Sequence, residues 1–509
     1  MKKSKLIGIV LLAIVVFMVV LGIADPEVVD AFNIYWMSAA AGLIPGILLL
    51  AGKKEAAVKF SRIVIGSVFI VSGLIKANDT VGFGIKLEEY FDENALGSFW
   101  AIFHPASHPI AFFVSGIEVL LGLALLFGAR PKLVSIALLG MTIFFGWLTY
   151  YTASCNEAQM AAITSGEAFD RVCVTDCGCF GDALRGSVGR SLTPWESFYK
   201  DLGLFLMTLV VVFYSGSVKV NSLKDNLVIL PASVLITLAF GGWLFGWMLP
   251  TYFLVIASIV FFIIKQLGLK GPKFDWILAL VLAVLTYGFA YYTYSHLPIK
   301  DYRPYAVGEN IKVQMKSAEE LGLEPTEYAN VYRLKNSETG EEMTMNSKEY
   351  LEKEIWKDKA WKIEYTSPEP IVISSGYEAP IASFNIMNED NFDIGEDLLN
   401  DPDYSFMVIA YDITKAEGGE VATKLKSLSE YAEAKGYDFY GITSSPYDLY
   451  EDYRHENQLA FPFYTADEIL LKTIIRSNPG VLLIKNGEIL AKWHANDVPT
   501  SVDSIEKMN

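Results

Sequence analysis

The chain has 509 residues, of which 52% are apolar, and its mean hydropathy of +0.33 is high for a water-soluble protein. The apolar residues come in long runs, which indicates a protein that crosses a membrane several times. The net charge of −17 is unevenly distributed, because residues 297–509 hold 21 Lys and Arg against 39 Asp and Glu. This acidic segment offers no basic patch, which excludes a nucleic-acid-binding protein.

Nine segments are long and apolar enough to cross a hydrocarbon core of roughly 30 Å as helices, which takes about 20 residues each. They lie at residues 5–24, 32–52, 59–76, 109–129, 133–152, 199–216, 227–248, 252–267 and 275–294. The first follows Lys2, Lys3 and Lys5, as in a signal peptide, but its length favours an uncleaved anchor. The prediction is an α-helical polytopic membrane protein of about nine spans.

Positive charges in the short loops predict the orientation. Lys and Arg residues follow the second, fourth, sixth and eighth spans, whereas the loop after the first span is acidic. By the positive-inside rule, the basic loops face the cytoplasm. These residues are Lys53, Lys54, Lys59, Arg130, Lys132, Lys219, Lys224, Lys265, Lys270 and Lys273. We therefore expect a multi-pass protein of the bacterial inner (cytoplasmic) membrane, with the loop 153–193 and the segment 297–509 in the periplasm.

All four cysteines lie in that outer loop, at Cys155, Cys173, Cys177 and Cys179. An oxidising compartment permits disulfides, and four cysteines allow three pairings. A bond between Cys177 and Cys179 would close a very small ring, and strained disulfides are good oxidants of other thiols. Cys155 and Cys173 could form the second pair and pass electrons to the first. All four are therefore candidate catalytic residues.

Two alternative roles for the cysteines stay open. Two structural disulfides that tie down a long loop account for the pattern nearly as well. A zinc site with four thiolates ranks third, because the spacing C-x-C differs from the usual C-x-x-C. The steps His104-Pro105 and His108-Pro109 do not favour a metal site, since proline breaks any helix that would align the imidazoles.

One carboxylate lies within a predicted span. Glu118 is surrounded by apolar residues, where a charge costs several kcal/mol unless it is paired or protonated. We therefore expect a functional or paired role for it. Lys76 lies at the outer end of another span and could pair with Glu118, but we favour a lysine that reaches the interface with its ammonium group.

The sixth span has a recognisable start. Thr193, Pro194 and Glu196 form a capping-box pattern, which places the first helical turn at Pro194. Trp195 and Tyr199 in the next turn favour an aromatic belt at the membrane interface. The alternative is a quinone pocket beside the thiols, whose mouth would be formed by Trp195, Phe198 and Tyr199 with Trp147, Tyr150 and Tyr151. Glu118, Trp195 and Tyr199 are the candidate cofactor-binding residues, and quinone is the candidate cofactor.

The extracytoplasmic part divides into two patterns. Residues 297–375 hold alternating segments at 330–334 and 361–365, with a turn at 337–340, and predict a small β-rich module. From residue 376, strands at 406–411 and 437–442 alternate with helices at 421–435 and 447–457, which indicates an α/β layer. A hairpin follows, formed by residues 480–484 and 489–493 around Asn486-Gly487.

This order, with Asn478-Pro479-Gly480 entering the hairpin, resembles the thioredoxin fold, in which a cis-proline occupies that place. Where thioredoxins carry C-x-x-C, this chain has residues 413–418 without a cysteine. Without a thiol the domain cannot exchange disulfides. The resemblance therefore implies a binding module whose groove beside Pro479 receives an extended peptide, with Asp412, Glu417 and Glu420 as an acidic rim.

Spans three to six resemble the DoxX and MauE group of four-helix membrane proteins. The resemblance is carried by residues 72–77, by Gly116-Ile117-Glu118 and above all by C-G-C-F-G-D at 177–182. It implies extracytoplasmic disulfide chemistry or a sulfur- and quinone-linked redox role. The domain division that follows is a transmembrane pair at 1–58, a DoxX/MauE-like four-helix domain at 59–216, three further transmembrane helices at 217–296, the β-rich module at 297–375 and the thioredoxin-like domain at 376–509.

The sequence therefore predicts a membrane thiol–disulfide or quinone-linked redox protein, a possible oxidoreductase, whose soluble domain binds an extracytoplasmic protein or peptide. Membrane lipid is the other expected partner. The alternative is a non-enzymatic membrane subunit of an envelope assembly, with structural disulfides and a thioredoxin-like interaction domain.

Overall fold

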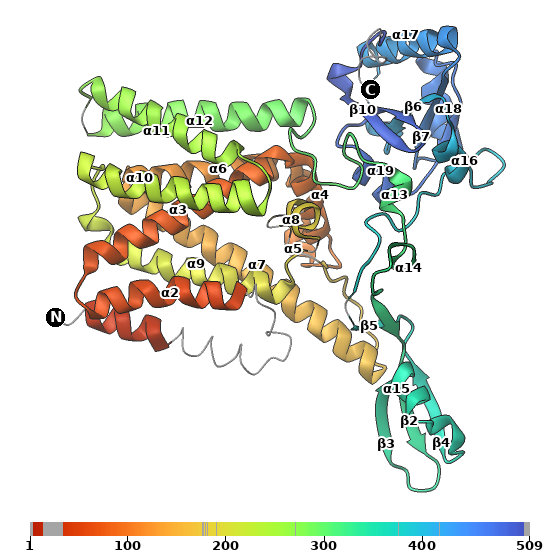
Figure 1. Cartoon of the computed structure of the whole chain (residues 1–509), viewed down its shortest axis with the longest axis horizontal. Coiled ribbons are helices and arrows are strands. Elements are labelled where there is room, and N and C mark those ends of the chain that lie inside the picture. Colours follow the sequence, from red (N-terminus) through yellow and green to blue (C-terminus); the bar gives the residue numbers. More distant parts are fainter. Residues whose placement is uncertain are drawn as a thin grey trace. The chain divides into compact units, whose positions relative to one another are not determined.

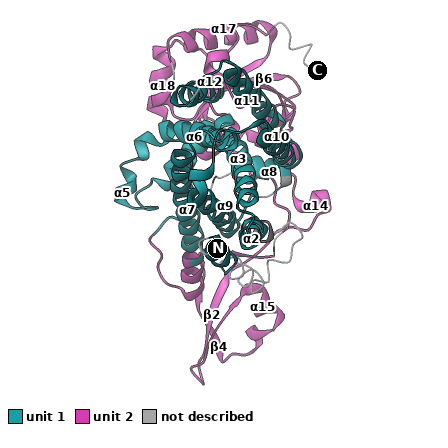
Figure 2. Cartoon of the chain, turned by 90° about the vertical axis from the view of Figure 1, so that its left-hand side faces the viewer, with its two compact units in different colours: residues 1–157, 171–293 teal, residues 158–170, 294–509 magenta. Residues whose placement is uncertain are grey.

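A computed structural model of the protein describes residues 4–13, 34–175, 178, 180, 182–189, 191–269, 271–374, 376–416 and 418–502. The chain forms two compact units. Unit 1 comprises residues 1–157 and 171–293, and unit 2 comprises residues 158–170 and 294–509 (Figure 2). Cys177, Cys179 and Glu417 lie outside the described residues.

Unit 1 is a helical bundle (Figure 1). Among the described residues, seven helical segments are long and apolar enough to cross a membrane, which makes the chain a multi-pass membrane protein. The helices of this unit are α2 (Ile34–Leu50), α3 (Lys54–Asn78), α4 (Thr80–Tyr90), α5 (Ser98–Ala101), α6 (Ser107–Phe127), α7 (Pro131–Ser165), α8 (Asp182–Val188), α9 (Pro194–Tyr214), α10 (Leu223–Thr237), α11 (Leu249–Gln266) and α12 (Pro272–Ser295).

The seven segments correspond to the third to ninth predicted spans. The two N-terminal predictions are only partly described: residues 4–13 are helical, and α2 has 17 residues. The main difference is α7, which has 35 residues where the prediction ended at residue 152. A helix of that length exceeds what a bilayer requires. Its last residues, 158–165, belong to unit 2.

Helices α3 and α6 pack closely because glycines lie between them. A Cβ atom added to Gly73 would lie 2.7 Å from a Val119 methyl and 2.9 Å from the Ser115 carbonyl oxygen. One added to Gly122 would lie 2.8 Å from the Gly66 carbonyl oxygen. Small residues at a helix interface let the backbones approach in a membrane, where the hydrophobic effect does not drive helix association.

A buried arginine caps the C-terminal end of α6. Arg62 donates hydrogen bonds to the carbonyl oxygens of Leu125 (2.9 Å) and Leu126 (3.0 Å) and to Oδ1 of Asn221 (2.7 Å). A cation is favourable at a helix C-terminus, where the last carbonyl groups lack partners within the helix. This contact explains how a guanidinium is tolerated inside a predicted span.

The predicted start of the sixth span is confirmed. Thr193 is the N-cap of α9, its side chain accepts a hydrogen bond from the Glu196 amide, and Glu196 accepts one from the Thr193 amide. Pro194 occupies the first turn. This cap fixes the point at which the chain leaves the cysteine loop.

Unit 2 contains the predicted β-rich module. Strands β2 (Val331–Asn336), β3 (Glu342–Asn346) and β4 (Trp361–Thr366) form an antiparallel sheet in the order β3-β2-β4, and α15 (Ser347–Glu352) follows β3. Strands β1 (Glu327–Ala329) and β5 (Ile371–Ser374) form a separate pair. The end of α7 belongs to the same unit, and Arg333 donates a hydrogen bond to the Ser165 carbonyl oxygen.

The C-terminal part of unit 2 is an α/β layer. Five strands lie in the order β10-β9-β6-β7-β8, with β6 parallel to β7, β7 parallel to β8, and β9 antiparallel to both β6 and β10. The strands are β6 (Tyr404–Ala410), β7 (Asp438–Thr443), β8 (Phe463–Thr465), β9 (Gly480–Lys485) and β10 (Glu488–His494). The central strand β6 is buried on both faces, as expected for a strand between two layers.

Helices cover both faces of this sheet. Helices α17 (Glu420–Lys435) and α18 (Tyr447–Glu456) pack on the face of Phe406 and Val408, and α16 (Gly395–Asn400) and α19 (Glu468–Ile474) pack on the face of Met407 and Ile409. The predicted hairpin is present as β9 and β10. Asn486 and Gly487 both have positive φ angles at its turn, and the Asn478–Pro479 bond is cis.

Candidate functional site

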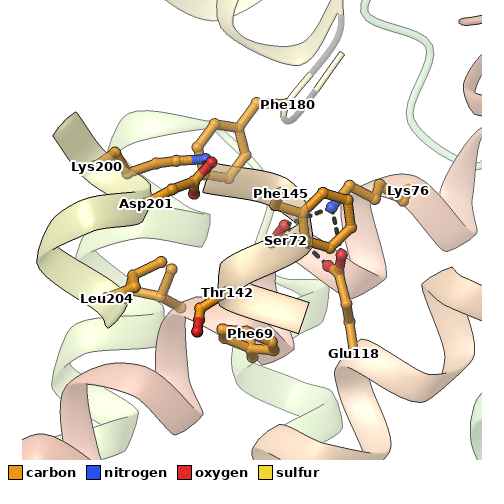
Figure 3. A pocket seen from close by; sticks show the side chains of 11 residues that line it. Phe69, Ser72, Lys76, Glu118, Thr142, Phe145, Phe180, Lys200, Asp201 and Leu204 are labelled. Atoms are coloured by element: carbon orange, nitrogen blue, oxygen red, sulfur yellow. Dashed lines mark hydrogen bonds and ion pairs between the residues drawn. The ribbon is translucent and has the colours of Figure 1, made fainter. Parts of the chain in front are cut away.

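Four helices of unit 1 enclose a small polar cavity within the membrane bundle. Each contributes side chains: α3, α6, α7 and α9 (Figure 3). Four ionisable groups face it, although the rest of its wall is largely apolar. The lining residues are Val68, Phe69, Ser72, Lys76, Glu118, Thr142, Phe145, Phe180, Lys200, Asp201 and Leu204.

Lys76 and Glu118 form the first charge pair. The Lys76 ammonium lies 2.5 Å from Oε1 of Glu118, and the two side chains are 5% and 3% exposed. Ser72 joins them, because its hydroxyl donates to Oε2 of Glu118 (3.0 Å) and accepts from Lys76 (3.1 Å). The Phe145 ring lies 4.7 Å from the ammonium, at a distance typical of a cation–π contact.

The pairing corrects the expectation for Lys76. We expected its ammonium at the interface, but the residue is buried and contacts Glu118 directly. The physical reason is the close packing of α3 on α6 at Gly73, which places Lys76 one turn beyond the contact and beside the carboxylate. The paired role expected for Glu118 is present.

Lys200 and Asp201 form the second charge pair at the start of α9. Their side chains lie 3.0 Å apart and are 15% and 6% exposed. Thr149 of α7 donates a weak hydrogen bond to Asp201 at 3.4 Å. The Lys200 ammonium lies 5.1 Å from the centre of the Phe180 ring. Phe180 directly follows Cys179 in the sequence.

Lys200 and Asp201 were not among the site residues expected from the sequence. The available signal was Asp201, which lies inside the predicted span 199–216, and an ionisable residue within a span is a functional candidate by default. The same signal applied to Arg62 inside the span 59–76. Among the residues that carry this signal, Glu118 alone was singled out from the sequence.

The free volume of the cavity is about 30 Å³. That is room for one or two water molecules with several polar partners.

The cysteine loop is tied to α7 by a disulfide. Cys155 and Cys173 are bonded, with Cα atoms 5.7 Å apart, and they are 6% and 9% exposed. Asn156 reinforces the connection by donating to the Val174 carbonyl oxygen at 2.9 Å. Because two of the four sulfur atoms are bonded to each other, a zinc site with four thiolates is wrong for this state. The predicted chemistry of Cys177 and Cys179 lies outside the described residues.

The aromatic residues expected around a quinone pocket separate into two clusters. Trp195 contacts Tyr150, Phe198 and Tyr199, with ring centres 5.7 to 6.1 Å apart, and donates to Glu157. Trp147 instead stacks on Trp100 at 5.2 Å, and Tyr151 joins that second cluster through Trp147. Of the described residues that line the cavity, none is Trp195 or Tyr199, so these two are not brought together with Glu118.

The segment that follows β6 in unit 2 is held by hydrogen bonds. Asp412 accepts from the Thr414 amide and hydroxyl and pairs with Lys415 at 3.0 Å. Asn478 donates to the Asp412 carbonyl oxygen at 2.7 Å, which joins this segment to Pro479. Burial alone would raise the pKa of Asp412, but the contacts with Thr414 and Lys415 hold it below its ordinary value. The predicted acidic rim is thus partly neutralised, and Glu420 also pairs with Lys424.

Comparison with known proteins adds one match. Residues 54–158 match the family model of methylamine utilisation protein MauE. This segment is therefore similar to a family of membrane proteins, and it includes α3, α6 and most of α7 with the pair Lys76–Glu118. No curated protein and no solved structure matches the chain.

Proposed function

We propose that this protein is a membrane thiol–disulfide exchange protein whose reactive residues are Cys177 and Cys179. The observation that carries the proposal is Phe180, which follows Cys179 directly and lines the cavity next to Lys200. Paired charges inside a membrane are costly and are rare outside functional sites.

The proposed step needs only thiols and a disulfide. A thiolate of the client attacks one sulfur of the Cys177–Cys179 bond, so that bond breaks and a mixed disulfide forms. The second client thiolate then attacks the mixed disulfide. The client leaves oxidised, and the protein keeps two thiols and the two electrons. The reverse sequence reduces a client disulfide.

The cavity residues would handle the protons of this exchange. A thiol reacts as its thiolate, and a nearby cation favours the thiolate. Lys200 supplies that cation next to Phe180, and Asp201 and Glu118 are carboxylates able to take up the released protons. Water in the cavity would connect the two charge pairs.

Quinone binding stays a prediction. No step of the proposed exchange passes through a quinone. A quinone would serve to remove the two electrons from the protein thiols, with Trp195 and Tyr199 as the candidate contacts.

We place the cysteine loop and residues 297–509 in the periplasm of a bacterium, with the helices in the inner membrane. The basic loops support this orientation. The closed bond between Cys155 and Cys173 also supports it, because disulfides persist in oxidising compartments. A membrane-impermeant thiol reagent should then label Cys177 in reduced, intact spheroplasts. Labelling only after permeabilisation contradicts the orientation.

The C-terminal layer of unit 2 is proposed to be thioredoxin-like and to bind an extended protein or peptide beside Pro479. Its mixed sheet with helices on both faces supports the fold. Residues 376–509 contain no cysteine, so the role would be binding. Substitution of Asn478 by Trp should abolish capture of the partner from membrane extracts while the sheet stays folded. Unchanged capture places the contact on another face.

The alternative is a non-enzymatic membrane subunit with structural disulfides. The low exposure of Cys155 and Cys173 favours this role for that pair, because buried sulfurs exchange poorly. The matching family is named for methylamine utilisation. For the segment 54–158 we therefore also propose a membrane role in that process.

One experiment separates the two functions. Cys179→Ser leaves Cys177 free to form a mixed disulfide that cannot resolve, so acid-trapped cells should contain a covalent adduct with a client. Lys200→Met should slow the formation of that adduct. A variant in which all four cysteines are replaced gives the opposite test. If cells that produce this variant show the same thiol status of envelope proteins as cells with the unsubstituted protein, the exchange function is wrong and the structural alternative holds.

A further inference from the structure

A second cavity in unit 1 lies between α6, α7 and α12, and the proposed exchange does not use it. Its free volume is about 160 Å³. The wall is almost entirely apolar and is formed mainly by leucine and alanine side chains, among them Leu121, Leu278 and Leu282. Two of its lining residues, Leu133 and Trp276, are 62% and 64% exposed, so the cavity is open at these apolar side chains.

A guanidinium lies in the wall of this otherwise apolar cavity. Arg130 contributes to the lining, its Nε atom pairs with Asp275 at 2.9 Å, and its side chain is 39% exposed. The guanidinium also lies 5.2 Å from the Trp276 ring. A guanidinium has five N–H donors in a fork that suits a phosphate, and one carboxylate does not use all of them.

Two further basic residues lie close to Arg130 and Asp275 in the sequence. Lys132 follows Arg130 by two residues at the start of α7, and Lys273 precedes Asp275 by two residues at the start of α12. Both lysines are exposed. The starts of α7 and α12 together therefore carry three basic residues and one carboxylate. Basic pockets between transmembrane helices on the cytoplasmic side are suited to acidic lipid head groups.

We infer that this cavity binds an anionic phospholipid, with part of an acyl chain between α6, α7 and α12 and the phosphate at Arg130. The apolar wall and the single guanidinium match the two chemical parts of such a lipid. A soluble phosphate would match only one of them. Asp275 competes with the phosphate for Arg130 and keeps the binding reversible.

The test uses the full-length protein, delipidated in detergent and titrated with phosphatidylglycerol, with bound lipid counted by native mass spectrometry. Phosphatidylcholine with the same chains should bind about fivefold more weakly, the effect of one interfacial charge. Arg130→Gln should remove this preference. Asp275→Asn should strengthen phosphatidylglycerol binding about fivefold, because the competing carboxylate is gone.

Two further variants complete the design. Leu133→Trp blocks the exposed rim and should weaken binding of both lipids, whereas Lys224→Gln removes a predicted cytoplasmic charge away from the cavity and should change neither. If Arg130→Gln fails to fold, the lipid binding of Asp275→Asn and Leu133→Trp tests the inference instead. Equal binding of the two lipids by the unsubstituted protein overturns the inference. So does weaker binding by Asp275→Asn, or displacement by glycerol 3-phosphate as effective as that by phosphatidylglycerol.

Discussion

Lys76 and Glu118 form an ion pair with an N–O distance of 2.5 Å inside the membrane bundle, and each side chain is about 5% exposed or less. The two residues come from different helices, so their contact depends on how α3 packs on α6. It also brings a cation and a carboxylate to the cavity that Phe180 lines. Substitutions of Lys76 and Glu118 therefore test both the packing of α3 on α6 and the role of the cavity.

Removal of one partner should destabilise the protein strongly. Lys76→Met or Glu118→Gln leaves the remaining group buried without its partner, which costs about 3–5 kcal/mol of unfolding free energy. The double variant Lys76→Met with Glu118→Leu should recover most of this stability, because no unpaired charge remains. Chemical unfolding in detergent measures the effect.

The matched control is the more exposed pair Lys59–Asp225, whose side chains are 34% and 28% exposed. Lys59→Met should cost less than about 1 kcal/mol. If the double variant is stable but its cysteines no longer exchange, the pair serves the chemistry as well as the fold. Equal costs for Lys59→Met and Lys76→Met would contradict the burial argument.

The packing of α3 on α6 predicts that Gly73 tolerates no side chain. In Gly73→Ala the new methyl would meet Val119, Glu118 and the Ser115 carbonyl oxygen at less than 3.0 Å. The helices must move apart, at a cost of about 1–3 kcal/mol. Gly140→Ala on α7 is the control, since no atom lies within 4 Å of its added Cβ. The midpoint temperature of thermal unfolding should fall for Gly73→Ala and stay unchanged for Gly140→Ala.

Much of the architecture could be predicted from local patterns. Apolar runs located the helices α3, α6, α7 and α9 to α12, the capping box at Thr193 located the start of α9, and Asn486-Gly487 located the hairpin turn. These features depend on neighbouring residues alone. The end of α7 could not be predicted from hydropathy, because its last turns leave the apolar run and belong with unit 2.

The candidate site was only partly predictable. Glu118 was identified because a carboxylate in a span is conspicuous, but its partner depends on the contact at Gly73, which no local pattern encodes. Lys200 lies at a helix start, where a lysine has an ordinary explanation. The separation of Trp147 from Trp195 likewise reflects tertiary packing.

In unit 2, Asp301 predicts a pH dependence of stability. It accepts hydrogen bonds from Arg303 (2.8 Å) and Lys492 (2.9 Å), both of which are nearly fully buried. Burial alone would raise the pKa of Asp301, but the two cations outweigh it and hold that pKa below its ordinary value of 3.8. The contribution of Asp301 to stability is therefore complete above its unfolded pKa of about 3.8. It is lost as the pH falls from there towards the lower pKa of the folded state.

We expect Asp301→Asn to lower the stability of unit 2 by about 3 kcal/mol or more at pH 6, since Arg303 and Lys492 lose their buried anion. Burial lowers the pKa of Lys492 to about 7, so both groups are mainly cationic at that pH. The difference from the unsubstituted protein should shrink below about pH 4. Limited proteolysis across a urea series in the full-length protein measures it. Glu342→Gln, which breaks an exposed pair with Lys335, should leave stability unchanged. A difference that is constant from pH 6 to pH 3 would contradict the charge argument.

The disulfide between Cys155 and Cys173 should stabilise the cysteine loop without taking part in exchange. It joins residues 18 apart in the sequence, and closing a loop of that size contributes about 3 kcal/mol. Cys155→Ala with Cys173→Ala should therefore lower the unfolding free energy by about that amount. Strong reductant should destabilise the unsubstituted protein, once it reaches the buried sulfurs, but should not destabilise the double variant. Because Cys177 remains, the folded fraction of this variant should still form the client adduct when Cys179 is also replaced by Ser. Loss of that adduct with unchanged stability would show instead that all four cysteines exchange electrons.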